Sequence, residues 1–104
     1  MITGNGPLGS GAAERSEIFA GDYLNKLAGE QIELECRRRL EEGCREIVVN
    51  FSQTDIVNSI GISILLGLID RAQNTGAKVV FSEVKEETVE LFDMLGLTRH
   101  VTIA

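Results

Sequence analysis

Apolar residues recur along this chain with two periods, one typical of helices and one of strands. A first helix is predicted over about 28–42 and ends at Gly43, because apolar residues recur at steps of four with charged residues between them: Leu24, Ala28, Ile32, Cys36 and Leu40. Two further helices are predicted over 60–74 and 86–95, the second of them closed by an αL cap at Gly96.

Short β-branched runs between turn residues predict the strands. They lie at 18–20, 47–49, 78–81 and 101–103, with a brief extended piece at 56–57. Because helices and strands alternate, the predicted fold class is α/β, a mostly parallel sheet with right-handed helical crossovers. Such crossovers also fit half of a flavodoxin-like fold or a thioredoxin-like domain, but the chain has neither a Gly-rich phosphate loop after its first strand nor a Cys-x-x-Cys motif.

The start of the helix at 60–74 is the most informative place in the chain. Ser59 lies at or beside the helix N-terminus, where its hydroxyl can cap free backbone N–H groups and where the helix dipole favours negative charge. The helix is apolar on nearly every side, so we expect it to be buried on several sides or exposed for a partner. Gly61 interrupts the apolar run and is expected to serve a close approach or the helix geometry.

Composition and charge narrow the classes of function. The 104 residues allow one domain, with 43% hydrophobic and 25% charged residues. The net charge of −6 argues against a nucleic-acid partner, and the basic cluster 37–39 is flanked by glutamates, so we expect a solvated helix face with i,i+4 ion pairs. No apolar run reaches the roughly 18 residues that span a membrane, and no signal pattern opens the chain, so we expect no membrane association and a cytoplasmic location.

Reactive side chains are few. Cys36 and Cys44 would lie roughly 12 Å apart on or just past one helix, too far for a disulfide, and we expect both to be small core residues. His100 is the single histidine and is expected at the surface or partly packed. No set of residues supplies a nucleophile, a base and an oxyanion donor together, so we expect no catalytic residues, no metal and no cofactor.

The order of these signals resembles the STAS domain of bacterial anti-sigma factor antagonists. The similar segments run from about Ile18 to Ile103 and comprise a strand-ending turn at 21–25, a strand at 46–51, a loop-to-helix junction at 58–61 and a last helix and turn at 91–97. The resemblance implies a small STAS-like domain over 14–104. Residues 1–13 are expected to be a disordered segment derived from an expression tag, with 6–10 as the cleavage scar.

The family's first strand is expected to be missing from this chain. Only 18–20 is left as a strand before Gly21, so the resemblance leaves one sheet edge uncovered. A second copy of the chain is the most available cover, and we therefore expect a homodimer, with a domain-swapped form among the alternatives.

The resemblance implies a partner-switching regulator of transcription and not an enzyme. Its partner would be an anti-sigma factor that is also a serine kinase of the histidine-kinase-like ATPase type, and Ser59 would be the phosphorylated residue. The expected partner surface comprises Asn25, Asn58, Ser59, Ile60, Gly61 and Ile62.

Two asparagines depart from the family pattern. Asn58 and Asn25 stand where the family has aspartates, which removes two charges that would repel phosphate and two groups that a kinase or its metal could read. An alternative is therefore an accessory STAS module without phosphate chemistry, in a signalling scaffold or a transporter regulatory region. A small nucleotide- or lipid-binding domain is a third and weaker reading, because no phosphate-cradling sequence stands out.

Overall fold

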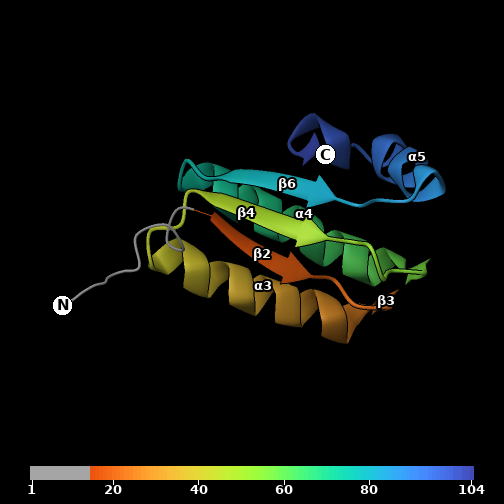
Figure 1. The fold of residues 1–104 in the computed structure, drawn as a ribbon, viewed down its shortest axis with the longest axis horizontal. Helices are drawn as coiled ribbons and strands as arrows, with labels where there is room; N and C mark the ends of the chain where they lie inside the picture. Colours follow the sequence, from red (N-terminus) through yellow and green to blue (C-terminus); the bar gives the residue numbers. More distant parts are fainter. Residues whose placement is uncertain (1–14) are drawn as a thin grey trace.

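The computed structural model describes residues 15–104, and the expected tag segment at 1–13 lies outside the described residues. Figure 1 shows the arrangement of the elements. In chain order they are β2 (Arg15–Phe19), β3 (Tyr23–Leu24), α3 (Lys26–Glu41), β4 (Glu46–Asn50), β5 (Ile56–Val57), α4 (Ser59–Asn74), β6 (Lys78–Ser82), α5 (Glu86–Met94), the 3₁₀ helix η1 (Leu97–Arg99) and β7 (Thr102–Ile103).

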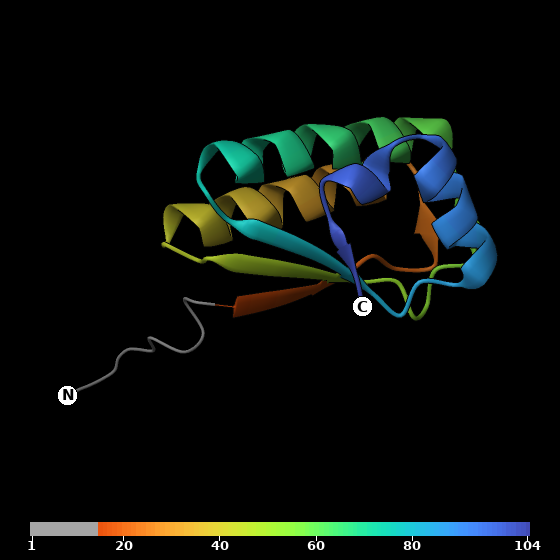
Figure 2. The same cartoon turned by 90° about the horizontal axis from the view of Figure 1, so that it is seen from above.

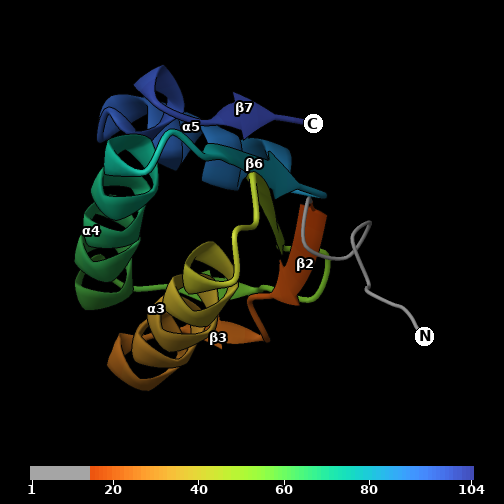
Figure 3. The same ribbon diagram turned by 90° about the vertical axis from the view of Figure 1, so that its left-hand side faces the viewer.

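Four of the strands form one parallel sheet in the order β2-β4-β6-β7. Helices α3 and α4 lie side by side on the same face of this sheet, as Figures 2 and 3 show from two directions. The parallel strands and helical crossovers confirm the predicted α/β class, in which each helix returns the chain to the start of the next parallel strand.

The core lies between the sheet and the two long helices. Ile47, Val49 and Phe81 point from the central strands into it and are 0% exposed. Helix α5 is attached at the carboxyl ends of these strands, where Phe92 meets Phe51 and Phe81 with ring centroids 5.5 Å away from each. Aromatic pairs at this separation add to the stabilisation that burial supplies.

A second, two-stranded parallel sheet joins the segments that precede the long helices. Tyr23 pairs with Ile56, and Leu24 pairs with Val57. The sequence predicted the extended piece at 56–57 but not its partner, because a two-residue strand carries no periodicity. This small sheet places the N-termini of α3 and α4 next to each other.

The bounds of the first strand and first helix differ from the predictions. The strand runs over Arg15–Phe19 and not over 18–20, because its exposed Arg15 and Glu17 alternate with buried Ser16 and Ile18, a pattern that its polar residues hide. Helix α3 begins at Lys26 and not near Ala28, because Asn25 caps it.

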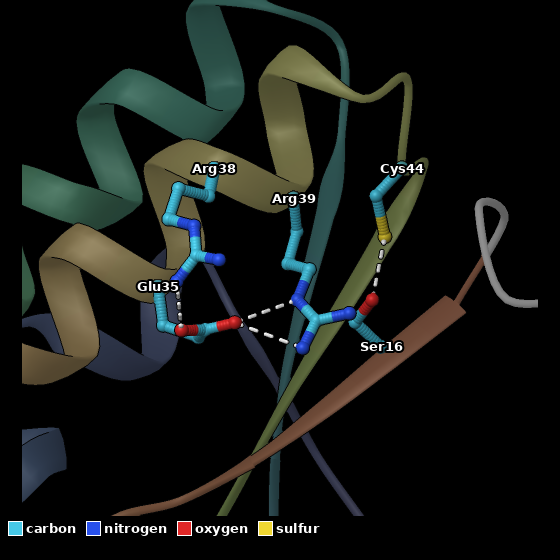
Figure 4. Close-up of polar contacts among 5 residues, drawn as sticks. All are labelled: Ser16, Glu35, Arg38, Arg39 and Cys44. Carbon is cyan, nitrogen blue, oxygen red and sulfur yellow. Dashed lines mark hydrogen bonds and ion pairs between the residues drawn. The ribbon is translucent and has the colours of Figure 1, made fainter.

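The predicted charged face of α3 and the two core cysteines are confirmed. Figure 4 shows Glu35 bound to Arg38 and Arg39, with N–O distances of 3.1 and 2.8 Å. Both cysteines are buried and free, and the Cys44 thiol donates to the Ser16 hydroxyl at 3.5 Å. The basic cluster is therefore largely neutralised by glutamates of its own helix.

Within residues 15–104, strand β2 pairs only with β4. In the described part of the chain, β2 is therefore an edge strand of the sheet. Any strand before Arg15 would fall outside the described residues, so the expected loss of the family's first strand stays a prediction.

Candidate functional site

The two helix starts are built in the same way. In each, a two-residue strand is followed by an extended asparagine that caps the helix. The side chain of Asn25 accepts from the Ala28 amide at 3.0 Å, and that of Asn58 accepts from the Gly61 amide at 2.9 Å. An asparagine in this position satisfies one of the free N–H groups of the first turn.

Direct contacts hold the second helix start against the first. The backbone N–H of Asn58 donates to the Leu24 carbonyl at 2.9 Å, and its side-chain amide donates to the Tyr23 hydroxyl at 3.3 Å. A hollow of about 440 Å³ opens between the two starts, lined by Tyr23, Asn25, Lys26, Leu27, Glu30 and Asn58. Residues far apart in the sequence therefore share one surface.

Ser59 is the first residue of α4, and its side chain is exposed. The capping role expected of this serine belongs instead to Asn58, whose extended backbone allows its side chain to reach the third helical residue. Among residues 15–104, the Ser59 hydroxyl has no hydrogen-bond partner, while its carbonyl accepts from the Ser63 hydroxyl at 3.0 Å. The hydroxyl therefore lies at the positive end of the helix dipole and is free to react.

Gly61 lies where only a glycine fits. A Cβ atom on this residue would be 2.6 Å from the carbonyl oxygen of Leu24, which is a backbone atom of the small sheet. The structure therefore confirms the expected close approach. The missing side chain is what lets α4 begin directly on β3.

The residues predicted for the partner surface divide into two groups. Ser59 and Ile60 are exposed, and Asn25 and Asn58 are partly exposed. Gly61 and Ile62 are both buried, and Ile62, which is only 6% exposed, belongs to the core, so the expected place of these two residues on the surface is corrected. Ile62 points inward because it lies on the face of α4 that packs on the sheet.

Three exposed apolar side chains near Ser59 were not predicted from the sequence to belong to this surface. Tyr23 and Ile56 are opposite each other in the small sheet, and Leu27 lies in the first turn of α3. All three are more than 40% exposed. Their spacing in the sequence could have indicated them: Tyr23 and Ile56 each lie two residues before a capping asparagine, and Leu27 lies two residues after Asn25.

The other side chains that were considered for chemistry lie outside the surface around the two helix starts. His100 is exposed, as expected. Burial, followed by the neighbouring Cys44 thiol, raises the pKa of Cys36 from its ordinary 9.0 to about 11, so this thiol is protonated near neutral pH. In the part of the chain that the structure describes, no three metal-binding side chains gather, and no helix is long and apolar enough to cross a membrane.

Comparisons with known proteins agree with this architecture. A protein of Bordetella bronchiseptica, provisionally named the anti-sigma factor antagonist BtrV, is 25% identical over 73 residues, which are 70% of this chain and 63% of that protein. The chain thus spans less than two thirds of that relative.

Two solved structures share the fold. The anti-sigma factor antagonist SpoIIAA in its unphosphorylated form has a TM-score of 0.73 at 19% identity, over 88% of this chain and 81% of that one. The Bacillus cell fate determinant SpoIIAA in the phosphorylated form has a TM-score of 0.69, also at 19% identity, over 88% and 84%. Residues 22–104, which are most of the chain, match the STAS domain family, and the chain therefore belongs to that family.

Proposed function

We propose that this STAS domain is an anti-sigma factor antagonist that works by partner switching. Its partner is an anti-sigma factor of the histidine-kinase-like ATPase type, and it meets the partner in the cytoplasm through the surface around Ser59. The observation that carries the proposal is the exposed hydroxyl at the first position of α4, beside a second helix start and exposed apolar side chains. The names of the similar proteins support an anti-sigma factor as the partner.

Phosphorylation of Ser59 is the proposed switch. A phosphate adds a charge of about −1.5 to −2 and three acceptor oxygens. Placed among Ile56, Ile60 and Tyr23, it would have to be desolvated whenever an apolar partner surface closes over it, so the phosphorylated form is released. The free N–H groups of the α4 N-terminus would meanwhile stabilise the phosphate on the free protein.

Asn58 is compatible with phosphorylation of Ser59, although it replaces the carboxylate that the family has at this position. Its side chain already caps α4 and donates to Tyr23, so the junction is held in place without an aspartate. The kinase would then supply its own metal ligands. The alternative, an accessory module without phosphate chemistry, predicts instead that no kinase phosphorylates Ser59.

The test is a phosphorylation assay with a matched serine control. We would incubate the chain with Mg-ATP and each purified histidine-kinase-like anti-sigma factor from the same genome, and locate any phosphate by mass spectrometry. We expect one phosphate on the wild type and on Ser63→Ala, and none on Ser59→Ala. Ser63 is also exposed and lies one helical turn away, so it controls for access to α4. Binding of a kinase without phosphate transfer would support the accessory-module alternative.

A further inference from the structure

Four exposed apolar side chains surround the two helix starts. Tyr23 and Ile56 are 41% and 58% exposed, and Leu27 and Ile60, four residues after each, are 63% and 51% exposed. Single exposed apolar residues are ordinary, but four at matched positions of two adjoining junctions form a patch. We refer to Tyr23, Leu27, Ile56 and Ile60 as the junction patch.

Unbalanced negative charge lies at the same end of the molecule. Helix α5 exposes Glu86, Glu87 and Glu90, and none of them forms an ion pair with another residue between 15 and 104. Figures 1 and 2 show α5 at the end where α4 begins. Lys85, at the start of α5, binds Asp55, which directly precedes β5, so the acidic helix is tied to the junctions.

The lysines near the patch are already paired, and Arg99 of η1, which follows the C-terminus of α5, offsets at most one of the three glutamates. Lys26 is paired with Glu30 at 3.2 Å, and Lys85 is paired with Asp55. The arginines of α3 lie at its far end and are bound by Glu33 and Glu35. The field around the junction patch is therefore negative, in a chain whose total charge is −6.

We infer that the partner surface that covers the junction patch is apolar at its centre and basic around it, and that the carboxylates of α5 steer its approach. This inference rests on the proposed function and specifies the chemistry of its partner. Burial of the patch would supply most of the affinity, whereas charge complementarity would mainly raise the association rate. A second copy of this chain fits the patch poorly, because both copies would bring the same negative field.

The experiment measures association and dissociation rates by stopped-flow fluorescence, using the anti-sigma factor kinase identified by the phosphorylation assay. One variant carries Glu87→Gln and Glu90→Gln in α5. Its matched control carries Glu41→Gln and Glu42→Gln at the far end of α3, where both glutamates are also exposed and outside any ion pair within residues 15–104. The two variants change the net charge equally, so they separate local steering from total charge.

We expect the α5 variant to lower the association rate by about threefold or more at low ionic strength, with the control within about 1.5-fold of wild type. Added salt should slow the wild type and remove the difference between the variants. Equal effects of the two variants, a rate that does not depend on salt, or faster association of the α5 variant would overturn the inference while leaving the proposed function intact. Failure of every kinase to bind would instead overturn the proposed function, and the inference with it.

Discussion

Two glycines of α4 differ in what surrounds them, and this difference can be measured. Gly61 faces the Leu24 backbone at a distance that no Cβ tolerates, whereas Gly67 has open space around the position of a Cβ. We expect Gly61→Ala to cost about 1–3 kcal/mol of unfolding free energy, because α4 must move off β3. Gly67→Ala should gain about 0.5–1 kcal/mol from its better helix propensity.

Urea denaturation of both variants checks this prediction. The two alanines are added to the same helix, so propensity alone would stabilise both. If Gly61→Ala proved as stable as Gly67→Ala, the close approach of α4 to Leu24 would not limit the residue at position 61.

The buried thiol of Cys36 makes stability depend on alkaline pH. Its pKa is raised from 9.0 to about 11 in the folded chain, so between these values the unfolded chain releases the proton first. Folding stability contributed by this group is therefore complete below pH 9 and is lost as the pH rises toward 11.

The measurement is the free energy of unfolding as a function of pH, for the wild type and for Cys36→Ala. Below pH 9 the variant should be less stable because it leaves a cavity, but its stability should fall less steeply between pH 9 and 11. Parallel curves for the two proteins would show that the thiol does not titrate differently on folding.

At the scale of elements, α5 is anchored to the core by the buried ring of Phe92. Phe92 is 0% exposed and packs against the rings of both Phe51 and Phe81, which also contact each other. We expect Phe92→Ala to cost about 3–5 kcal/mol, since it removes a fully buried ring. Met94 is 83% exposed in the same helix, so Met94→Ala should stay within about 0.5 kcal/mol of wild type. Thermal unfolding of the two variants gives the comparison, and similar losses would mean that α5 is not anchored by Phe92.

The elements that could be predicted from the sequence are those with a clear period or a clear end. The steps of four in α3, the β-branched run of β4 and the glycine after α5 all indicated their elements correctly. The small sheet could not be predicted, because Tyr23 and Leu24 form a strand only by pairing with Ile56 and Val57. Two-residue pairing is decided by the tertiary fold and leaves no pattern in the chain.

The candidate site was predictable in position but not in detail. The junction at Ser59 was found because a hydroxyl precedes a long apolar helix. The choice of Asn58 as the cap depends on its extended backbone, and the inward direction of Ile62 depends on which face of α4 meets the sheet. The contribution of Tyr23 and Leu27 to the same surface follows from a contact across more than thirty residues.

At the scale of the whole molecule, the edge of β2 bears on self-association. Among residues 15–104 this strand pairs only with β4, and Phe19 at its end is 56% exposed. Strand edges of this kind favour pairing with a further strand, so the sequence-based expectation of a homodimer is retained as a prediction. Light scattering across a concentration series should show a rising mass. A strictly monomeric mass at high concentration would mean that the edge is covered or is blocked by charges such as Arg15 and Glu17.

The most direct test of the proposed switch is the effect of substitutions at Ser59 on partner binding. We would measure the affinity of the anti-sigma factor kinase for Ser59→Asp and Ser59→Ala, which replace the hydroxyl with and without a charge at the same exposed position. We predict that Ser59→Ala binds tightly and that Ser59→Asp binds at least about tenfold more weakly, a difference of about 1.4 kcal/mol. The loss should lie in faster dissociation, because a charge at Ser59 must be desolvated against the junction patch. Equal affinity of the two variants would contradict the proposed switch.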